Sequence, residues 1–219
     1  MTPSPDLSGM RIVATVVNSR EAACAADLSP DLIEVRIDLM DTDPQRELPS
    51  IRSVWKGPII LTNRSTSEGG RFDGSPAMWW EIAKPLLRYG DLVDVEMAYS
   101  SFSPEIHRLG KSIIASRHAD TMPSAEELAD LARDLRRYGD IPKIVVRPAD
   151  ERDLLTLLSF TLSAEKPICT GVQGEAYRYA RVILPLFGSE LAYTHAGTPA
   201  AQGQYSLGDF QKVQALLRG

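Results

Sequence analysis

Cysteine, histidine and long apolar runs are scarce in this chain. Its 219 residues include two cysteines, Cys24 and Cys169, and three histidines. Two such distant cysteines provide neither a disulfide framework nor a CxxC metal motif, which is typical of a protein from a reducing compartment. We therefore expect a cytoplasmic protein without a cysteine-based metal site.

Segments that direct a protein to membranes are also missing. No stretch approaches the roughly 18 apolar residues of a membrane-spanning helix, and residues 1–10 have no apolar core of a secretory signal. We expect no association with membranes. The net charge of −5 argues against non-specific binding of nucleic acid. An anionic ligand therefore requires positive charge concentrated in one pocket.

The remaining composition is that of an ordinary globular protein, with 43% hydrophobic and 24% charged residues. No low-complexity tract, linker or internal repeat divides the chain. The length suits one domain, and we expect a single catalytic domain over residues 1–219.

Short apolar runs rich in β-branched residues recur along the chain, as is typical of strands buried on both faces. They predict eight strands, at residues 11–17, 32–38, 58–63, 92–96, 112–117, 142–146, 167–171 and 191–195. Helical spacing between and after them predicts helices at 75–89, 124–138, 151–163, 175–187 and 209–217. This alternation favours the α/β class and a single (β/α)₈ TIM barrel, with a doubly wound open sheet as the alternative.

Ionisable residues gather at the carboxyl ends of the predicted strands, which is the end where TIM barrels place their active sites. Glu34, Arg36 and Asp38 occupy alternate positions of the second strand and therefore one face of it. The others are Arg64 and Glu68 after the third strand, Asp94 and Glu96 on the fourth, His118 after the fifth and Lys143 inside the sixth.

Lys143 is the strongest catalytic candidate among these residues. It lies in an apolar strand between Pro142 and Ile144, and lysine is seldom buried without a function. An ammonium group buried near other cations loses its proton more readily than an exposed one. Attack of an amine on a carbonyl requires that loss. The sequence thus predicts a nucleophilic lysine with cationic neighbours.

A purely structural interpretation exists for several of the other residues. Glu34 and Arg36 fit an ion pair inside the barrel about equally well. A single histidine after a strand is more often structural than catalytic. His107 falls in a predicted helical segment, whereas His195 ends the last strand and is placed to line a pocket without an assigned role.

Taken in order, these fragments resemble type I 3-dehydroquinate dehydratases. The matching motifs are Glu34-x-Arg36-x-Asp38, Thr62-x-Arg64, Glu68-Gly69-Gly70, Asp94-x-Glu96, Ser116-x-His118, Thr121-x-Pro123, Asp140-x-x-Lys143, Phe187-Gly188-Ser189 and Gly203-Gln204. The resemblance implies a hydro-lyase that converts 3-dehydroquinate to 3-dehydroshikimate in the shikimate pathway of aromatic amino-acid biosynthesis. It also implies that the enzyme uses no metal and no organic cofactor, and that it is a homodimer.

The resemblance assigns a role to each matched residue. Lys143 matches the lysine that forms the Schiff base, His118 the general acid and base, and Glu68 the carboxylate beside that histidine. Arg181 matches the arginine that binds the substrate carboxylate. The other substrate-contacting positions are Glu34, Arg36, Arg64 and Gln204.

Two segments depart from the family pattern. The family segment Met-Gly-x-x-Gly-x-x-Ser-Arg keeps only its first glycine and its arginine in residues 173–181, so Arg178 competes with Arg181 for the carboxylate. The closing loop, usually Ser-Ala-Pro-Gly-Gln, has Ala200 in place of the serine. Its small residues suit a mobile lid that brings Gln204 to the bound acid.

Two other functions stay open at this point. A Schiff-base aldolase would share Lys143, but only Gly171 and Gly174 resemble its expected phosphate loop. A non-catalytic sensor of a shikimate-like acid fits the altered closing loop, but Lys143, His118 and Glu68 argue against it. The apolar residues 210–217 either contribute to a dimer interface or cap the barrel.

Overall fold

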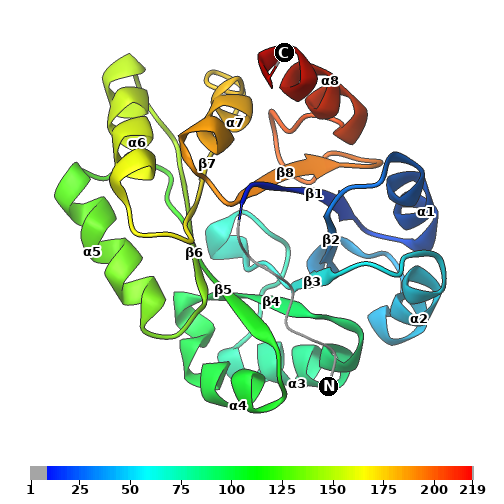
Figure 1. Ribbon diagram of the computed structural model, residues 1–219. Coiled ribbons are helices and arrows are strands. Elements are labelled where there is room, and N and C mark those ends of the chain that lie inside the picture. The colour runs from blue at the N-terminus through cyan, green and yellow to red at the C-terminus, as the bar shows by residue number, and fades with distance from the viewer. Residues whose placement is uncertain (1–8, 219) are drawn as a thin grey trace.

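The computed structural model describes residues 9–218 and shows a barrel of strands inside a ring of helices (Figure 1). The strands pair in the order β7-β6-β5-β4-β3-β2-β1-β8, and all of these pairs are parallel. Residues 1–8, where the absence of a secretory signal was predicted, and residue 219 lie outside the described part. The strands are β1 (Arg11–Val16), β2 (Leu32–Arg36), β3 (Ile59–Thr62), β4 (Leu92–Glu96), β5 (Ser112–His118), β6 (Ile141–Val146), β7 (Cys169–Val172) and β8 (Leu191–His195).

A helix or a helical turn follows each strand. The helices are α1 (Ser19–Leu28), α2 (Pro44–Val54), α3 (Pro76–Leu86), α4 (Ser103–Arg108), α5 (Ala125–Arg136), α6 (Glu151–Ser163), α7 (Ala180–Ile183) and α8 (Leu207–Arg218). Short 3₁₀ turns lie at η1 (Ile37–Leu39), η2 (Thr66–Glu68), η3 (Leu87–Tyr89), η4 (Met97–Phe102) and η5 (Leu184–Phe187). No helix in this part of the chain is long and apolar enough to span a membrane.

Local sequence explains where several helices begin. Ser124 and Glu127 form the predicted capping box at α5, each side chain accepting a hydrogen bond from the other's backbone N–H. Asp150 caps α6 through the N–H groups of Arg152 and Asp153. These caps position the helices that pack against the outside of the barrel.

Two differences between the predicted and the observed elements have a local cause. The helix predicted at 175–187 is reduced to α7 and η5, because the chain turns at Gly174 (φ +82°) and Pro185 offers no N–H to continue an α-helix. The second strand ends at Arg36 rather than at Asp38. Asp38 lies in η1, where its carboxylate accepts the backbone N–H groups of Arg64 and Arg71.

Inside the barrel, each strand contributes one residue to an apolar layer. The layer consists of Val13, Leu32, Ile60, Leu92, Ile114, Ile141, Cys169 and Leu191. Because alternate residues of a strand face the same side, the positions two residues later form the next layer. Those positions are Thr15, Glu34, Thr62, Asp94, Ser116, Lys143, Gly171 and Tyr193. The strand period therefore places a polar layer directly above an apolar floor.

The barrel closes between β7 and β8 through a mixture of backbone and side-chain contacts. The N–H of Glu190 donates to the carbonyl of Ile168 at 2.8 Å. Ser189 Oγ accepts from the N–H of Thr170 at 3.0 Å and donates to its carbonyl at 3.1 Å. This closure confirms the barrel and shows that the alternative of an open, doubly wound sheet is wrong.

Candidate active site

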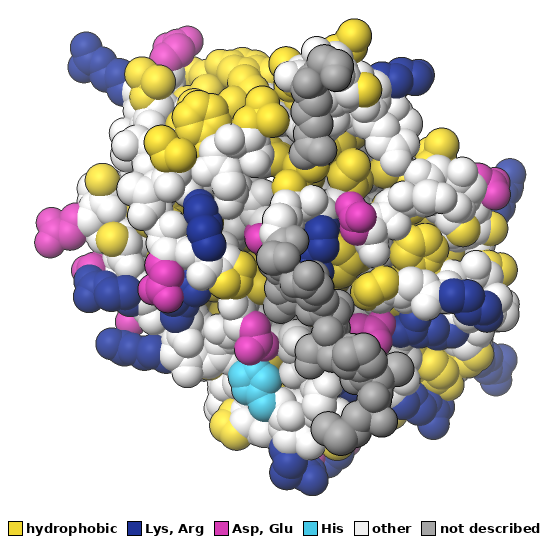
Figure 2. Space-filling view, viewed as in Figure 1, with side chains coloured by type: hydrophobic (Ala, Val, Ile, Leu, Met, Phe, Trp, Pro, Cys, Tyr) yellow, Lys and Arg dark blue, Asp and Glu magenta, His cyan; other side chains and the backbone are white. Residues whose placement is uncertain are grey.

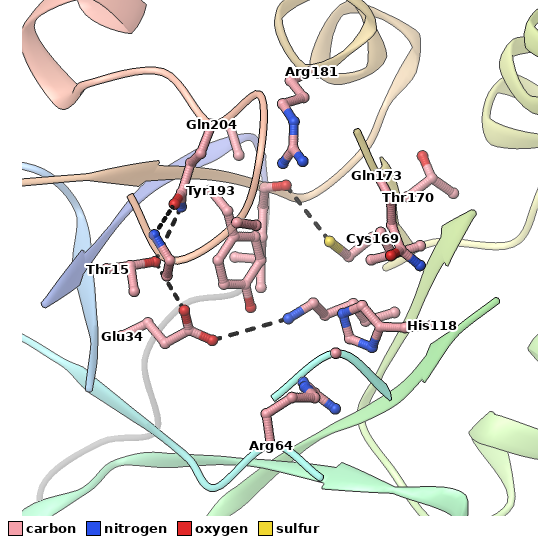
Figure 3. Close-up of a pocket in the computed structure, with 18 of the residues that line it drawn as sticks. Thr15, Glu34, Arg64, His118, Cys169, Thr170, Gln173, Arg181, Tyr193 and Gln204 are labelled. Atoms are coloured by element: carbon pink, nitrogen blue, oxygen red, sulfur yellow. Dashed lines mark hydrogen bonds and ion pairs between the residues drawn. The ribbon is translucent and has the colours of Figure 1, made fainter. Parts of the chain in front are cut away.

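A cavity of about 220 Å³ lies at the carboxyl ends of the strands. All of the predicted site residues line it together, although they come from positions spread over most of the chain (Figure 3). They are Glu34, Arg36, Arg64, Glu68, His118, Lys143, Arg181 and Gln204. The order of the strands in the barrel thus brings residues that are far apart in the sequence to one cavity.

Lys143 lies on the inner wall of this cavity and is 5% exposed. Its Nζ donates to Asp94 Oδ2 at 3.0 Å and lies 4.0 Å from Glu34 Oε1. The ammonium group sits between two carboxylates, and the nearest cation lies on the far side of Asp94. Arg64 reaches the other oxygen of the same Asp94, with Nη2 2.7 Å from Oδ1.

Glu34 is held by two threonine hydroxyls. Thr15 Oγ1 donates to Oε2 and Thr62 Oγ1 donates to Oε1, both at 2.8 Å. The interpretation of Glu34 and Arg36 as an ion pair is wrong, because Arg36 makes a two-pronged contact with Asp38 at 2.8 and 2.7 Å. Glu34 therefore faces Lys143 as an oriented carboxylate.

Arg64 is buried among three carboxylates. Its Nη1 lies 3.0 Å from Glu96 Oε1 and 3.4 Å from Glu68 Oε2, and its Nη2 contacts Asp94. Burial lowers the pKa of Arg64, but the carboxylates outweigh it and raise that pKa, so the guanidinium stays charged. Burial would raise the pKa of Asp94, but Arg64 and Lys143 hold it below its ordinary value. Asp94, to which the sequence assigned no role, thus links the two cations.

His118 and Glu68 form a directly bonded pair. His118 Nδ1 lies 2.9 Å from Glu68 Oε2, and the His118 backbone N–H donates to the same oxygen at 3.0 Å. Burial, with the positive charges of Arg64 and Lys143, holds the pKa of His118 well below its ordinary value of 6.5. The imidazole is therefore neutral near pH 7, with Nδ1–H turned to Glu68 and Nε2 left to accept a proton.

Burial also changes the ionisation of Glu68. It raises the pKa of that carboxyl to about 7, against the lowering effect of Arg64 and of the His118 N–H. Arg117 Nη1 contacts Glu68 Oε1 at 3.1 Å. Glu68 thus titrates near neutrality, while the imidazole bonded to it stays neutral and can accept a proton.

Arg181 and Arg178, the two candidates for binding a carboxylate, lie in different surroundings. Arg181 lines the cavity, and Figure 3 shows its guanidinium pointing into it. Its Nη2 donates to the carbonyl of Gln202 at 3.2 Å, while its Nε is buried and has no hydrogen-bond partner among the described residues. Burial lowers the pKa of Arg181 to about 10. Arg178 instead stacks 4.3 Å over the ring of Tyr205 and does not line the cavity.

The closing loop after β8 is anchored by Gln204. Its Nε2 donates to the carbonyl of Thr194 at 2.9 Å and to Thr15 Oγ1 at 3.3 Å, and its Oε1 accepts the N–H of Ala200 at 2.9 Å. Gly203 next to it has φ +77°, and a Cβ there would lie 2.4 Å from the carbonyl oxygen of Gly174. Only glycine fits where this loop crosses the connection after β7.

Sequence reasoning missed several residues of the cavity and misplaced one. The missed residues include Thr15, Arg147, Cys169, Gln173 and Tyr193. The alternation of β8 was the available signal that the Tyr193 side chain faces the interior of the barrel. His195 does not line the cavity, contrary to expectation, and its Nδ1 contacts the carbonyl of Gly197 at 2.6 Å. His107 pairs with Asp140 at the surface.

Within residues 9–218, no group of three or more His, Cys, Asp or Glu side chains is arranged to hold a metal ion. The groups available at the cavity are an amine, an imidazole, carboxylates and guanidinium groups, which suit bond-making to a carbonyl and proton transfer.

Comparison with known proteins supplies independent findings. A sequence profile of the family described as Type I 3-dehydroquinase matches residues 12–219. The 3-dehydroquinate dehydratase of Methanoregula boonei is 48% identical over 95% of this chain and 100% of its own length. That of Methanospirillum hungatei is 36% identical over 95% of this chain and 81% of its own. The crystal structure of the Geobacillus kaustophilus 3-dehydroquinate dehydratase superposes with a TM-score of 0.87 at 29% identity, covering 96% of this chain and 92% of that one.

Proposed function

The chain belongs to the type I 3-dehydroquinase family, and on that premise we propose that it dehydrates 3-dehydroquinate to 3-dehydroshikimate through a Schiff base at Lys143. The observation that carries the proposal is a buried amine, Lys143, in one cavity with the bonded pair of His118 and Glu68 and with Arg181. A type I enzyme from Clostridium difficile, 27% identical, has been solved with a covalently modified comenic acid.

Different residues of the cavity suit binding of the acid and the chemistry. Arg181 suits the substrate carboxylate because a guanidinium can donate to both oxygens at once and because its Nε has no partner among the described residues. Glu34 and Arg64 are held rigidly by neighbours, so they suit recognition of ring hydroxyls. We assign Arg36 and Gln204 to further contacts with the acid.

The carboxylates beside Lys143 favour the proposed intermediate. The amine adds to the carbonyl carbon, and loss of water from the adduct leaves an iminium that carries the positive charge the ammonium had. Asp94 at 3.0 Å and Glu34 at 4.0 Å stabilise that charge just as they stabilise the ammonium. The iminium draws electrons from the adjacent carbon and acidifies its proton.

His118 then makes two proton transfers. Neutral Nε2 removes the proton from the carbon next to the iminium, while Glu68 stabilises the imidazolium that forms. The imidazolium returns its proton to the hydroxyl one carbon further on, which leaves as water. Hydrolysis of the remaining imine releases the enone and restores Lys143, so one water is lost overall.

The ionisation of Glu68 sets a testable pH dependence. As pH falls through about 7, Glu68 takes up a proton and no longer accepts the Nδ1–H of His118, so kcat/KM of the parent falls there. Glu68→Gln cannot titrate, and we expect activity about 10- to 100-fold lower. Its acid limb moves below pH 6.5, because the remaining titration is that of His118. Steady-state rates from pH 5 to 9 measure both effects.

The control for this variant is Glu81→Gln, the same change at an exposed position of α3. It should keep the rate and the pH profile of the parent. An acid limb that stays near pH 7 in Glu68→Gln would show that another group sets it.

The closing loop gives a second test. Gln204→Ala removes the contacts to Thr194 and Ala200, and with them the proposed hydrogen bond to the charged acid. KM should rise about tenfold, since hydrogen bonds to charged groups contribute ~1.5–3 kcal/mol. Ala200→Ser adds a hydroxyl at the cavity and should lower KM a few-fold. Unchanged KM and kcat in Gln204→Ala would show that the loop is a fixed connector and no lid.

A direct assay tests the proposed activity against the alternatives. Purified protein given 3-dehydroquinate should produce a rise in ultraviolet absorbance as the conjugated enone forms, and chelators should leave the rate unchanged. Binding of the acid without any absorbance change would favour the sensor. Cleavage of a carbon–carbon bond in the acid would favour the aldolase.

We also propose that the protein is a cytoplasmic homodimer. Phe210 of α8 is fully buried against Val182 and Ala192, so this part of the helix covers the barrel. Leu216 and Leu217 are 83% and 50% exposed, and hydrophobic side chains gather over α7 and α8 in Figure 2. Sedimentation should give twice the chain mass, and Leu216→Glu should shift it toward the monomer.

A further inference from the structure

Tyr193 carries the one buried hydroxyl group of the cavity lining that has no hydrogen-bond partner within residues 9–218. It belongs to the polar layer of the barrel, two residues after Leu191 on β8. A buried hydroxyl without a partner is destabilising, and such groups are rare in native proteins. The position therefore requires an explanation beyond packing.

The surroundings of Tyr193 connect it to the amine. Lys143 Nζ lies over the ring, 4.0 Å from its centroid. Figure 3 shows the hydroxyl pointing toward Glu34, on the side of the cavity where that carboxylate faces the amine. The hydroxyl thus borders the space in which a carbonyl attacked by Lys143 must lie.

The carboxylates around this space can only accept hydrogen bonds when they are ionised. Glu34 and Asp94 are the carboxylates nearest to Nζ. Thr15 already donates its hydroxyl to Glu34. A carbonyl oxygen beside Nζ needs a donor, and Tyr193 offers an O–H that nothing else among the described residues engages.

Building on the proposed function, we propose that the Tyr193 hydroxyl donates a hydrogen bond to the oxygen of the carbonyl that Lys143 attacks. Negative charge develops on that oxygen as the C–N bond forms, and a donor already in place stabilises it. Burial, together with the charge of Glu34, raises the pKa of Tyr193 well above its ordinary value. The hydroxyl therefore keeps its proton throughout the neutral pH range.

The step balances without a change at Tyr193. The neutral amine adds to the carbonyl carbon, and one proton passes from nitrogen to oxygen to give the carbinolamine. The proton that His118 took from the Lys143 ammonium group to give the neutral amine then leaves with that oxygen as water, and the iminium remains. Tyr193 ends the step with the proton it had, so its role is confined to making and losing the carbinolamine.

Tyr193→Phe separates this role from packing, because the ring over Lys143 is retained. With saturating 3-dehydroquinate and rapid quenching by borohydride, we expect the trapped imine to form roughly tenfold more slowly than in the parent. We expect kcat/KM to fall by a similar factor. Tyr89→Phe, the same change in η3 away from the cavity, should match the parent in both measurements.

Thermal unfolding of Tyr193→Phe provides a second measurement. Because the change removes an unpaired buried hydroxyl, the variant should melt at or above the temperature of the parent. A melting temperature several degrees lower would show that the hydroxyl has a structural partner and would overturn the inference. Imine formation in Tyr193→Phe at the rate of the parent would also overturn the inference, if the parent turns over 3-dehydroquinate. A parent that does not turn over this acid would instead overturn the proposed function.

Discussion

His118→Ala should turn over 3-dehydroquinate about 10⁴-fold more slowly than the parent and still form the imine. A general acid–base group contributes ~10²–10⁴-fold, and the upper end applies because His118 serves more than one proton transfer. The amine of Lys143 makes the attack, so substrate should still be captured. Steady-state rates measure the loss, and mass spectrometry after borohydride reduction measures the imine.

A matched histidine offers the control. His107→Ala removes an exposed side chain that pairs with Asp140, and its rate should equal that of the parent. Near-normal turnover in His118→Ala would place the base elsewhere. His195 lies outside the cavity lining, so Glu68, with a pKa raised to about 7 by burial, would then be the first candidate.

Lys143→Met should abolish turnover and remove the adduct together. Methionine keeps the length of the chain but has no amine, so the covalent route is lost, and we expect a loss of more than ~10⁴-fold, beyond that of a single proton-transfer group. No imine should form at any concentration of 3-dehydroquinate. Rates and borohydride trapping on the same preparation test both statements.

The fold of this variant should survive, because Asp94 keeps Arg64 and the hydroxyl of Ser116 as partners. Lys212→Met, the same change on the exposed surface of α8, should retain full activity. Residual turnover of Lys143→Met within tenfold of the parent, in a preparation that melts like the parent, would contradict covalent catalysis.

Much of the barrel and its site could be predicted because both depend on short-range periodicity. Apolar runs gave the positions of the strands, and parallel strands bring their carboxyl ends to one rim. Arg36, Arg64 and His118 lie at or just beyond those ends, so their meeting at one cavity follows from the topology. The capping box at Ser124 could likewise be predicted, because it depends on two residues three positions apart.

Contacts across the barrel could not be predicted in this way. Asp94 reaches Lys143 past β5, since β4 and β6 each pair with that strand, and no local pattern encodes this approach. For that reason the two carboxylates beside the amine were not expected. Alternation along β8 places the Tyr193 side chain inside the barrel, but its hydroxyl without a partner can be recognised only once every neighbour has been placed.

The measurement that tests the Schiff base most directly is reduction of the parent during turnover. Borohydride added with 3-dehydroquinate should inactivate the protein irreversibly, and peptide mass spectrometry should locate the reduced adduct on Lys143. Borohydride without substrate should leave the protein active and unmodified. An adduct on another residue, or full activity and an unchanged mass after reduction of an actively turning-over preparation, would contradict the account.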